Sequence, residues 1–154
     1  MAELTGEPFP ILLVEDNEAH AELVIRGMRD SLEAHTIHHV PDGEKALDYF
    51  FNRGAYTDPI KNPRPSLVLL DLRLRRVDGL EVLRTVKTTP ALSPIPVVIL
   101  TSSDAESDIA RAYEYHANSY LVKPLDFKVF TKLMKDIVSY WLGWNAKPKA
   151  DPKG

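Results

Sequence analysis

The chain has 154 residues, the length of one ordinary domain, and its 44% hydrophobic content suffices for a single compact core. A formal charge of −3 without a basic stripe gives no electrostatic case for nucleic-acid binding, and the absence of cysteine excludes disulfides and thiolate metal sites. The N-terminus lacks the features of a signal peptide and the apolar runs are too short to span a bilayer, so we expect a cytoplasmic protein.

The first half of the chain alternates apolar runs with segments of helical periodicity. The run "FPILLV" is typical of a strand buried on both faces, and the run "SLVLLD" has the same character. A proline-rich stretch between them has no periodicity and predicts a loop. In chain order we expect a strand at 9–14, a helix at 17–32, a strand at 36–40, a helix at 42–54 that stops at Gly54, a loop at 55–65 and a strand at 66–71.

The second half continues the alternation. Asp104 and Asp126 are candidate N-caps, because their side chains can accept hydrogen bonds from the first free amides of a helix. We expect a helix at 79–87, a strand at 92–101, a helix at 105–116, a strand at 118–122 and a last helix from 127 to about 143. The domain organisation predicted from these elements is an N-terminal extension at 1–8, one domain at 9–143 and a polar tail at 144–154.

Polar side chains follow four of the expected strands. Such alternation predicts a parallel sheet with helices on both faces, in which ligands bind at the carboxyl ends of the strands. Those ends carry Glu15 and Asp16, Asp71, Thr101, and Lys123. Any one of these residues alone is most simply a solvated strand end, but independent loops have no reason to produce the whole set.

The three carboxylates need a compensating positive charge. Two carboxylates about 4 Å apart repel by roughly 4 kcal/mol at an effective dielectric constant near 20. Lys123 and a bound divalent cation are the two candidates for this charge. Ligands that are all oxygen suit Mg²⁺, whereas zinc is disfavoured without cysteine or paired histidines. We also expect Asp71, at the lip of a strand, to be open to solvent.

Four sequence blocks resemble the signature motifs of the bacterial response-regulator receiver domain, the chemotaxis-regulator-like family. They are "ILLVEDN", "LVLLDLRLRRVDG", "VVILTSS" and "YLVKPLD", and the likeness covers residues 9–143. The resemblance implies an α/β fold of the flavodoxin-like class, a three-layer αβα arrangement with a five-stranded parallel sheet of order 2-1-3-4-5 and five helices. The stretches "HHVPDGEKALDYFFNRGAY" and "PRPSLVLLDL" further resemble the single-domain regulators that partner bacterial phytochrome histidine kinases.

The resemblance also implies a role for each acidic residue. Asp71 would accept a phosphoryl group from a phosphohistidine of a sensor kinase. Asp16, Asp71 and the backbone carbonyl of Arg73 would hold Mg²⁺, while Glu15 would act mainly through a metal-bound water. This role agrees with the chemistry of phosphoryl transfer, which asks a protein mainly to position the reactants and to neutralise negative charge.

A second set of residues would bind the phosphoryl group and report its presence. By resemblance, Lys123, Thr101 and Ser102 would contact the phosphoryl oxygens, and Tyr120 would turn inward behind Thr101. The Lys123–Pro124 peptide would be cis and would aim the lysine.

The function that follows is a stand-alone switch and not an enzyme, with self-phosphorylation and slow autodephosphorylation as its only reactions. Phosphorylation would change partner binding at the face made by the fourth helix, fifth strand and fifth helix. The expected partner is a sensor histidine kinase, of the phytochrome type by the narrower resemblance. A histidine phosphotransfer protein and a second copy of the chain are further candidates, and we expect no nucleic acid or membrane. The aromatic residues Tyr140, Trp141 and Trp144 either cap the core or form a dimer interface.

Several positions depart from the family pattern. Arg75 stands where proline is usual, and His116 stands where glycine is common, which strains histidine if φ is positive. Arg73 and Ser103 lie two residues beyond Asp71 and Thr101, where the family tunes the loss of the acyl phosphate; the arginine would either screen water or touch the phosphate. His20 lies near the acidic edge, but we expect it to be solvated.

Three other functions compete with this hypothesis. A metal-dependent phosphatase or hydrolase with an aspartyl nucleophile would carry the nucleophile on its first strand, which here ends in Glu15 and Asp16. A nucleotide or flavin binder would need a glycine-rich or hydroxyl-rich loop after that strand. A phosphate-independent docking domain would share the fold without needing the acidic set.

Overall fold

Five parallel strands form one sheet in the computed structural model, which describes residues 9–32 and 36–148. The strand order is β2-β1-β3-β4-β5, so the predicted topology is confirmed. The strands are β1 (Ile11–Val14), β2 (Ile37–Val40), β3 (Leu67–Leu70), β4 (Val97–Thr101) and β5 (Ser119–Val122).

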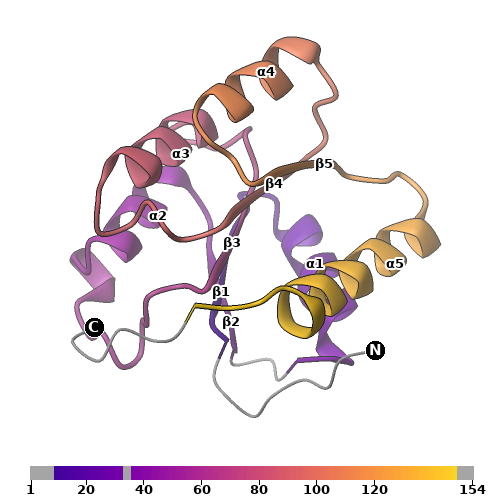
Figure 1. Cartoon of the computed structure of the whole chain (residues 1–154), viewed down its shortest axis with the longest axis horizontal. Coiled ribbons are helices and arrows are strands. Elements are labelled where there is room, and N and C mark those ends of the chain that lie inside the picture. The colour runs from indigo at the N-terminus through magenta and orange to yellow at the C-terminus, as the bar shows by residue number, and fades with distance from the viewer. Residues whose placement is uncertain (1–8, 33–35, 149–154) are drawn as a thin grey trace.

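Helices cover both faces of this sheet. Figure 1 shows α1 and α5 on one side and α2, α3 and α4 on the other, which is the predicted three-layer arrangement. The helices are α1 (Glu18–Arg29), α2 (Gly43–Phe50), α3 (Gly79–Thr88), α4 (Glu106–Glu114) and α5 (Phe127–Val138), with a 3-10 turn at Gly54–Tyr56 and a π-helical stretch at Ser139–Trp144. No helix in the described part of the chain has both the length and the hydropathy needed to cross a bilayer.

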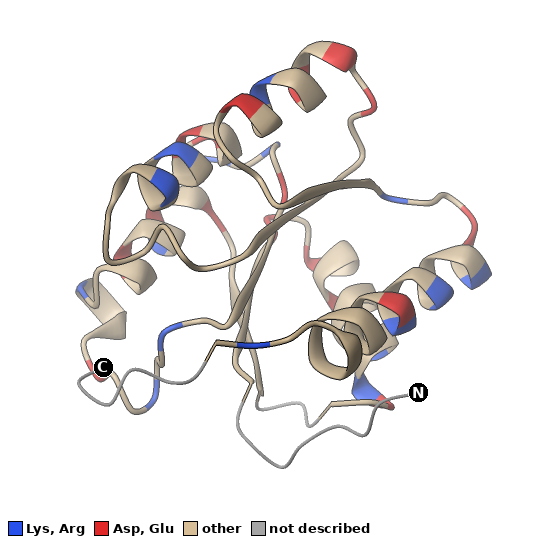
Figure 2. Cartoon of the chain, in the orientation of Figure 1, with Lys and Arg blue, Asp and Glu red and all other residues tan. Residues whose placement is uncertain are grey.

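The central strands contribute to two separate cores because successive strand residues point to opposite faces. In β1, Leu12 and Val14 pack with α2, α3 and α4, whereas Ile11 and Leu13 pack with α1 and α5. The strand β3 divides its residues in the same way. Full burial on both faces explains why these strands are unbroken apolar runs, and Figure 2 shows the charged residues confined to helices and loops.

Two glycines bring the loop after β3 close to its neighbours. A Cβ on Gly79 would lie 2.3 Å from the carbonyl oxygen of Asp71, and a Cβ on Gly43 would lie 1.8 Å from the carbonyl oxygen of Val77. Both contacts are with backbone, which cannot yield as a flexible side chain would. The glycines therefore fix the turn that carries the residues after Asp71.

The structure corrects three of the predicted boundaries. The strand predicted at 92–101 begins only at Val97, because hydrogen-bonded turns occupy the preceding residues. The helix α4 begins at Glu106, and its N-cap is Ala105 and not Asp104. The helix α2 ends at Phe50, while Gly54, with φ of 62°, opens the 3-10 turn that follows.

Other local expectations are confirmed or lie outside the described residues. His116 has φ of 68°, the conformation for which the family commonly uses glycine. Trp141 packs against the core beside α5, whereas Tyr140 and Trp144 are 53% and 65% exposed. The predicted extension at 1–8 and the end of the tail at 149–154 lie outside the described residues.

Replacing the two candidate N-cap residues should change the stability of the protein by different amounts. The Asp126 carboxylate accepts hydrogen bonds from the amides of Lys128 and Val129 at 2.8 and 3.1 Å, as predicted. Asp126→Ala should therefore lower the free energy of unfolding by about 1 kcal/mol in urea titrations. Asp104→Ala, which removes an exposed aspartate that caps no helix, should change it by less than about 0.5 kcal/mol. Equal losses in the two variants would contradict this assignment.

Candidate functional site

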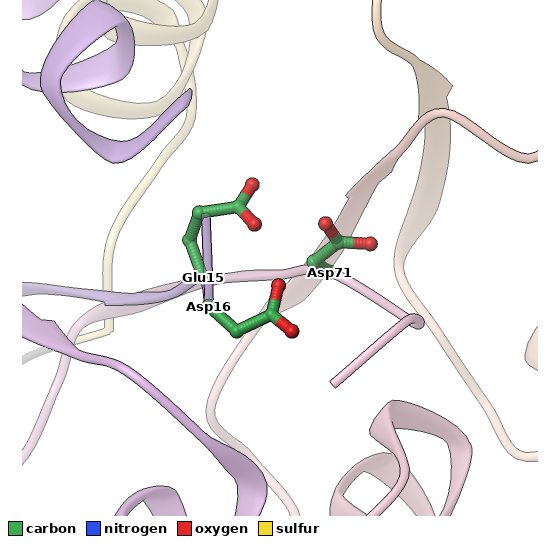
Figure 3. Close-up of side chains that lie close together, drawn as sticks. All are labelled: Glu15, Asp16 and Asp71. Carbon is green, nitrogen blue, oxygen red and sulfur yellow. The ribbon is translucent and has the colours of Figure 1, made fainter. Parts of the chain in front are cut away.

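The predicted acidic residues converge at the carboxyl ends of β1 and β3. The sheet register places Val14 beside Leu70, so the chain leaves both strands at the same level. One carboxylate oxygen from each of Glu15, Asp16 and Asp71 lies within 4.8 Å of the others. Figure 3 shows the three side chains turned toward one another.

Lys123, which follows β5, completes this set. Its ammonium donates to the Glu15 Oε1 atom, to Asp71 Oδ2 at 3.0 Å and to His20 Nδ1 at 2.9 Å. All three N–H groups of the ammonium therefore have acceptors. The predicted convergence of residues far apart in the chain is present, with one buried cation between two buried carboxylates.

His20 is the residue of this site that our sequence analysis missed. Its side chain is 40% exposed, so the ring is partly solvated as expected, but its Nδ1 atom also lies 2.9 Å from the Lys123 ammonium. The first turn of α1 brings it there, because Asn17 caps the helix by accepting the His20 amide at 3.0 Å. Burial and the Lys123 charge lower the pKa of His20, which favours the neutral ring that can accept a hydrogen bond.

Glu15 and Asp71 have pKa values displaced in opposite directions. Burial raises the pKa of Glu15 to about 7, against the stabilising effect of Lys123 and with a further contribution from Asp71. Burial also opposes ionisation of Asp71. However, Lys123, the Thr101 hydroxyl and the backbone N–H of Arg73 together hold the pKa of Asp71 below its usual range. Asp71 is thus the carboxylate that this environment keeps ionised.

Asp71 is less accessible than we expected. Only 8% of its side chain is exposed, because Lys123 lies directly against the carboxylate. Asp16 is the most exposed of the three carboxylates, with 22% of its side chain exposed. A reactant that binds Asp71 must displace part of the Lys123 contact.

The donor set suits a hard divalent cation. The three carboxylates offer only oxygen, and they lie close enough to repel one another strongly without a second positive charge. Arg75, which replaces the usual proline, has its Nε atom 3.8 Å from Asp16 Oδ2 and supplies part of that charge from the surface. The three carboxylates thus fit a divalent metal ion.

Of the three residues expected to bind or report the phosphoryl group besides Lys123, only Thr101 contacts Asp71. Thr101 is fully buried, and its hydroxyl interacts with the Asp71 carboxylate. The hydroxyl of Tyr120, a half-buried residue, donates to the Ser103 carbonyl at 2.8 Å. Ser102 is exposed at the edge of the site.

The predicted cis peptide at Lys123–Pro124 is wrong, because this bond is trans. Trans is the more stable form of an ordinary peptide bond before proline. The four-carbon side chain of Lys123 reaches both Glu15 and Asp71 from the trans backbone.

Arg73 has a different partner from the two we considered. Its Nη2 atom lies 2.5 Å from Asp108 Oδ2 on α4, while its backbone N–H donates to Asp71 Oδ1 at 3.1 Å. The Ser103 hydroxyl donates to the same Asp108 oxygen at 2.6 Å. Nothing in the sequence pattern distinguishes Asp108 from the other acidic residues of α4.

Comparison with known proteins places this geometry in a described family. The family model for the response regulator receiver domain matches residues 11–135. The probable methanogenesis regulatory protein FilR2 of Methanothrix harundinacea is 46% identical over 143 residues, which are 92% of this chain and 89% of FilR2. Response regulator Rcp1 of Synechocystis sp. is 39% identical over 150 residues, which are 97% of this chain and 100% of Rcp1.

Solved structures agree with the sequence relatives. The crystal structure of the Mn²⁺-bound form of Rcp1 superposes with a TM-score of 0.85 and 40% identity, covering 92% of this chain and 100% of Rcp1. The phosphorylated cyanobacterial phytochrome response regulator RcpA superposes with a TM-score of 0.86 and 36% identity, covering 93% of this chain and 100% of RcpA. The likeness therefore extends over nearly the whole described chain.

Mg²⁺ binding should weaken as the pH falls below the pKa of Glu15. Because that pKa is about 7, protons compete with the metal, and we expect the affinity to fall below this value by at most about ten-fold per pH unit. Calorimetric titrations between pH 6 and pH 8, in two buffers of different ionisation enthalpy, measure the affinity and the protons released. Glu15→Gln should remove most of the pH dependence. If the affinity of the unchanged protein for Mg²⁺ does not vary over this pH range, the prediction is wrong.

Proposed function

Because the chain belongs to the response regulator receiver family, we propose that it is a signalling switch that accepts a phosphoryl group on Asp71. The observation that supports this most directly is the environment of Asp71, an ionised carboxylate held between Lys123, Thr101 and two further acidic residues. In the proposed reaction an oxygen of Asp71 forms a bond to phosphorus while the bond from phosphorus to a histidine nitrogen breaks. The departing imidazole keeps the electron pair.

The residues around Asp71 have the charges that this transfer requires. When bound, Mg²⁺ neutralises negative charge on the phosphoryl group and aligns it with the acceptor oxygen. Asp16, Asp71 and the Arg73 carbonyl would hold the ion, with Glu15 acting through water. Lys123 would transfer its hydrogen bond from Asp71 to a phosphoryl oxygen. The transfer then needs no catalytic base, since an ionised carboxylate is already the nucleophile.

Phosphorylation would be reported through Thr101 and Tyr120. Thr101 already interacts with Asp71, so its hydroxyl is placed to follow a new phosphoryl oxygen. Tyr120 would then leave the Ser103 carbonyl and occupy the space behind Thr101. The altered face of α4, β5 and α5 would bind the output partner, because phosphoryl charge shifts a two-state element only where its contacts differ between the states.

A histidine kinase of the phytochrome type is the proposed phosphodonor. RcpA is a phytochrome response regulator, and the existence of a Mn²⁺-bound form of Rcp1 supports divalent metal binding by this chain. FilR2, with 46% identity, is named for the regulation of methanogenesis and not for a response to light. The signal to which this chain responds therefore depends on the kinase that phosphorylates it. A histidine phosphotransfer protein would serve equally as donor or acceptor at the same site, and the proposed location of the chain is the cytoplasm.

A homodimer is the second interaction that we propose. Tyr140 and Trp144 are exposed aromatic residues at the end of the last helix, and such residues are enriched at protein interfaces. Trp141, in contrast, packs against the protein's own core. Sedimentation of the Tyr140→Ser/Trp144→Ser double variant beside the unchanged chain tests this interface, and equal masses for the two chains count against it.

Phosphorylation at Asp71 is tested by mass spectrometry. With Mg²⁺ and acetyl phosphate, or with an autophosphorylated phytochrome-type kinase, the chain should gain about 80 Da in a base-labile adduct. Asp71→Asn should abolish the gain, whereas Asp78→Asn, at an exposed aspartate of the same loop, should leave it unchanged. Removing the metal with a chelator should slow the gain by at least about 100-fold.

An adduct that persists in Asp71→Asn would move the acceptor to another residue. No adduct with either donor would overturn the proposed function.

A further inference from the structure

A ring of interacting residues, most of them joined by hydrogen bonds, links Asp71 to helix α4. Asp71 accepts from the Arg73 backbone, and the Arg73 guanidinium donates to Asp108 Oδ2. The Ser103 hydroxyl donates to that same Asp108 oxygen, and the Ser103 N–H reaches Thr101 Oγ1 at 3.5 Å. Thr101 returns to Asp71 through its hydroxyl. We call these five residues the Asp71–Asp108 ring.

Helix α4 depends on this ring more than the other helices do. Its buried residues are Asp108 and Ala112, whereas α3 buries five residues against the sheet. Ala112 is the one fully buried apolar residue of α4, so the two hydrogen bonds of Asp108 add substantially to the contacts at the start of this helix. Asp108 is buried and accepts two hydrogen bonds, so it attaches α4 to the loops after β3 and β4 and does not belong to the solvated face of the helix.

Tyr120 is attached to the same ring. Its hydroxyl donates to the carbonyl of Ser103, the residue whose side chain binds Asp108. A displacement of Ser103 would therefore change the support of α4 and of Tyr120 together.

We propose that Asp108 and the phosphorylated form of Asp71 compete for Arg73 and Ser103, and that phosphorylation thereby releases the start of α4. This inference rests on the proposed function of Asp71. An acyl phosphate carries more negative charge than a carboxylate and offers more acceptor oxygens, and a guanidinium binds it through two parallel hydrogen bonds. Arg73 lies two residues from Asp71, and its side chain is 65% exposed, so it is free to turn toward the phosphoryl group.

Arg73 and Asp108 are positioning residues in this scheme. Neither needs to take part in the transfer of the phosphoryl group. Their pairing sets the free energy that phosphorylation must overcome to release α4. By thermodynamic linkage, weakening the pair should also strengthen binding of the phosphoryl group, since the two interactions exclude each other.

The linkage is tested with beryllofluoride, a phosphoryl mimic, in the presence of Mg²⁺ and the full chain. Asp108→Asn keeps the shape of the side chain and removes its charge, so half-saturation should need about five-fold less beryllofluoride than in the unchanged protein. Glu106→Gln is the matched control, because it removes an exposed charge from the same turn of α4. It should leave the half-saturating concentration unchanged. Replacing a residue with a merely structural role would weaken the binding of beryllofluoride or leave its affinity unchanged.

Hydrogen exchange of residues 103–112 supplies the second measurement. Beryllofluoride should raise amide exchange at the start of α4 about five-fold in the unchanged protein. Asp108→Asn should already show most of this rise without the mimic, and Glu106→Gln should not. Unchanged exchange on binding, or an Asp108→Asn variant that matches the unchanged protein in both assays, would overturn the inference.

The two proposals fail in different ways. If the chain gains no phosphoryl mass and binds no beryllofluoride, the proposed function of Asp71 is lost. A second outcome is that Asp71 is phosphorylated, but amide exchange at the start of α4 does not rise and Asp108→Asn binds beryllofluoride as the unchanged protein does. The proposed function then stands, and the proposed competition in the Asp71–Asp108 ring is wrong.

Discussion

The Lys123 ammonium is the interaction on which the rest of this site depends. It lies between Glu15 and Asp71, two carboxylates that are almost completely buried and that would otherwise repel each other. Its charge keeps Asp71 ionised, whereas Glu15, with a pKa raised to about 7, is the group that burial favours in the protonated form. Beside the same cation, two chemically similar carboxyl groups thus have different roles: Asp71 is the ionised nucleophile, and Glu15 is the group that takes up a proton near pH 7. The ammonium also covers Asp71, so a phosphoryl group that binds Asp71 must displace part of this contact.

The parallel sheet makes this arrangement possible. The loop after β3 connects the acidic site to the neighbouring helices. The register of β1 with β3 and of β4 with β5 brings residues from four strand ends to one edge. In the loop, Arg73 pairs with α4, Arg75 with Asp16, and Arg76 with Asp42 at the start of α2. The last two pairs join atoms 3.8 Å apart and their arginines are exposed, so they contribute little to stability. The Arg73 pair differs because its Nη2 atom lies 2.5 Å from Asp108 Oδ2, and this hydrogen bond joins the acidic site to helix α4.

The sequence predicted those parts of the structure that follow from periodicity and strand position. Five apolar runs defined the sheet, and the residues after them, including Asp71 and Lys123, met as expected. The failures concern side-chain direction and loops. The contact of His20 with Lys123 depends on a rotamer, and the pairing of Arg73 with Asp108 joins a loop without periodicity to one of several acids on α4. The start of α4 was misplaced because both Asp104 and Ala105 are compatible with a first turn, and only the path of the loop from Ser103 decides between them.

A crystal structure with Mg²⁺ and beryllofluoride tests the central claim most directly. We predict beryllofluoride on an oxygen of Asp71, the metal between Asp16 and Asp71, and the hydrogen bond of the Lys123 ammonium moved from Asp71 to a fluorine atom. A structure in which beryllofluoride binds elsewhere, or in which Lys123 keeps its contacts with both Glu15 and Asp71, would contradict it.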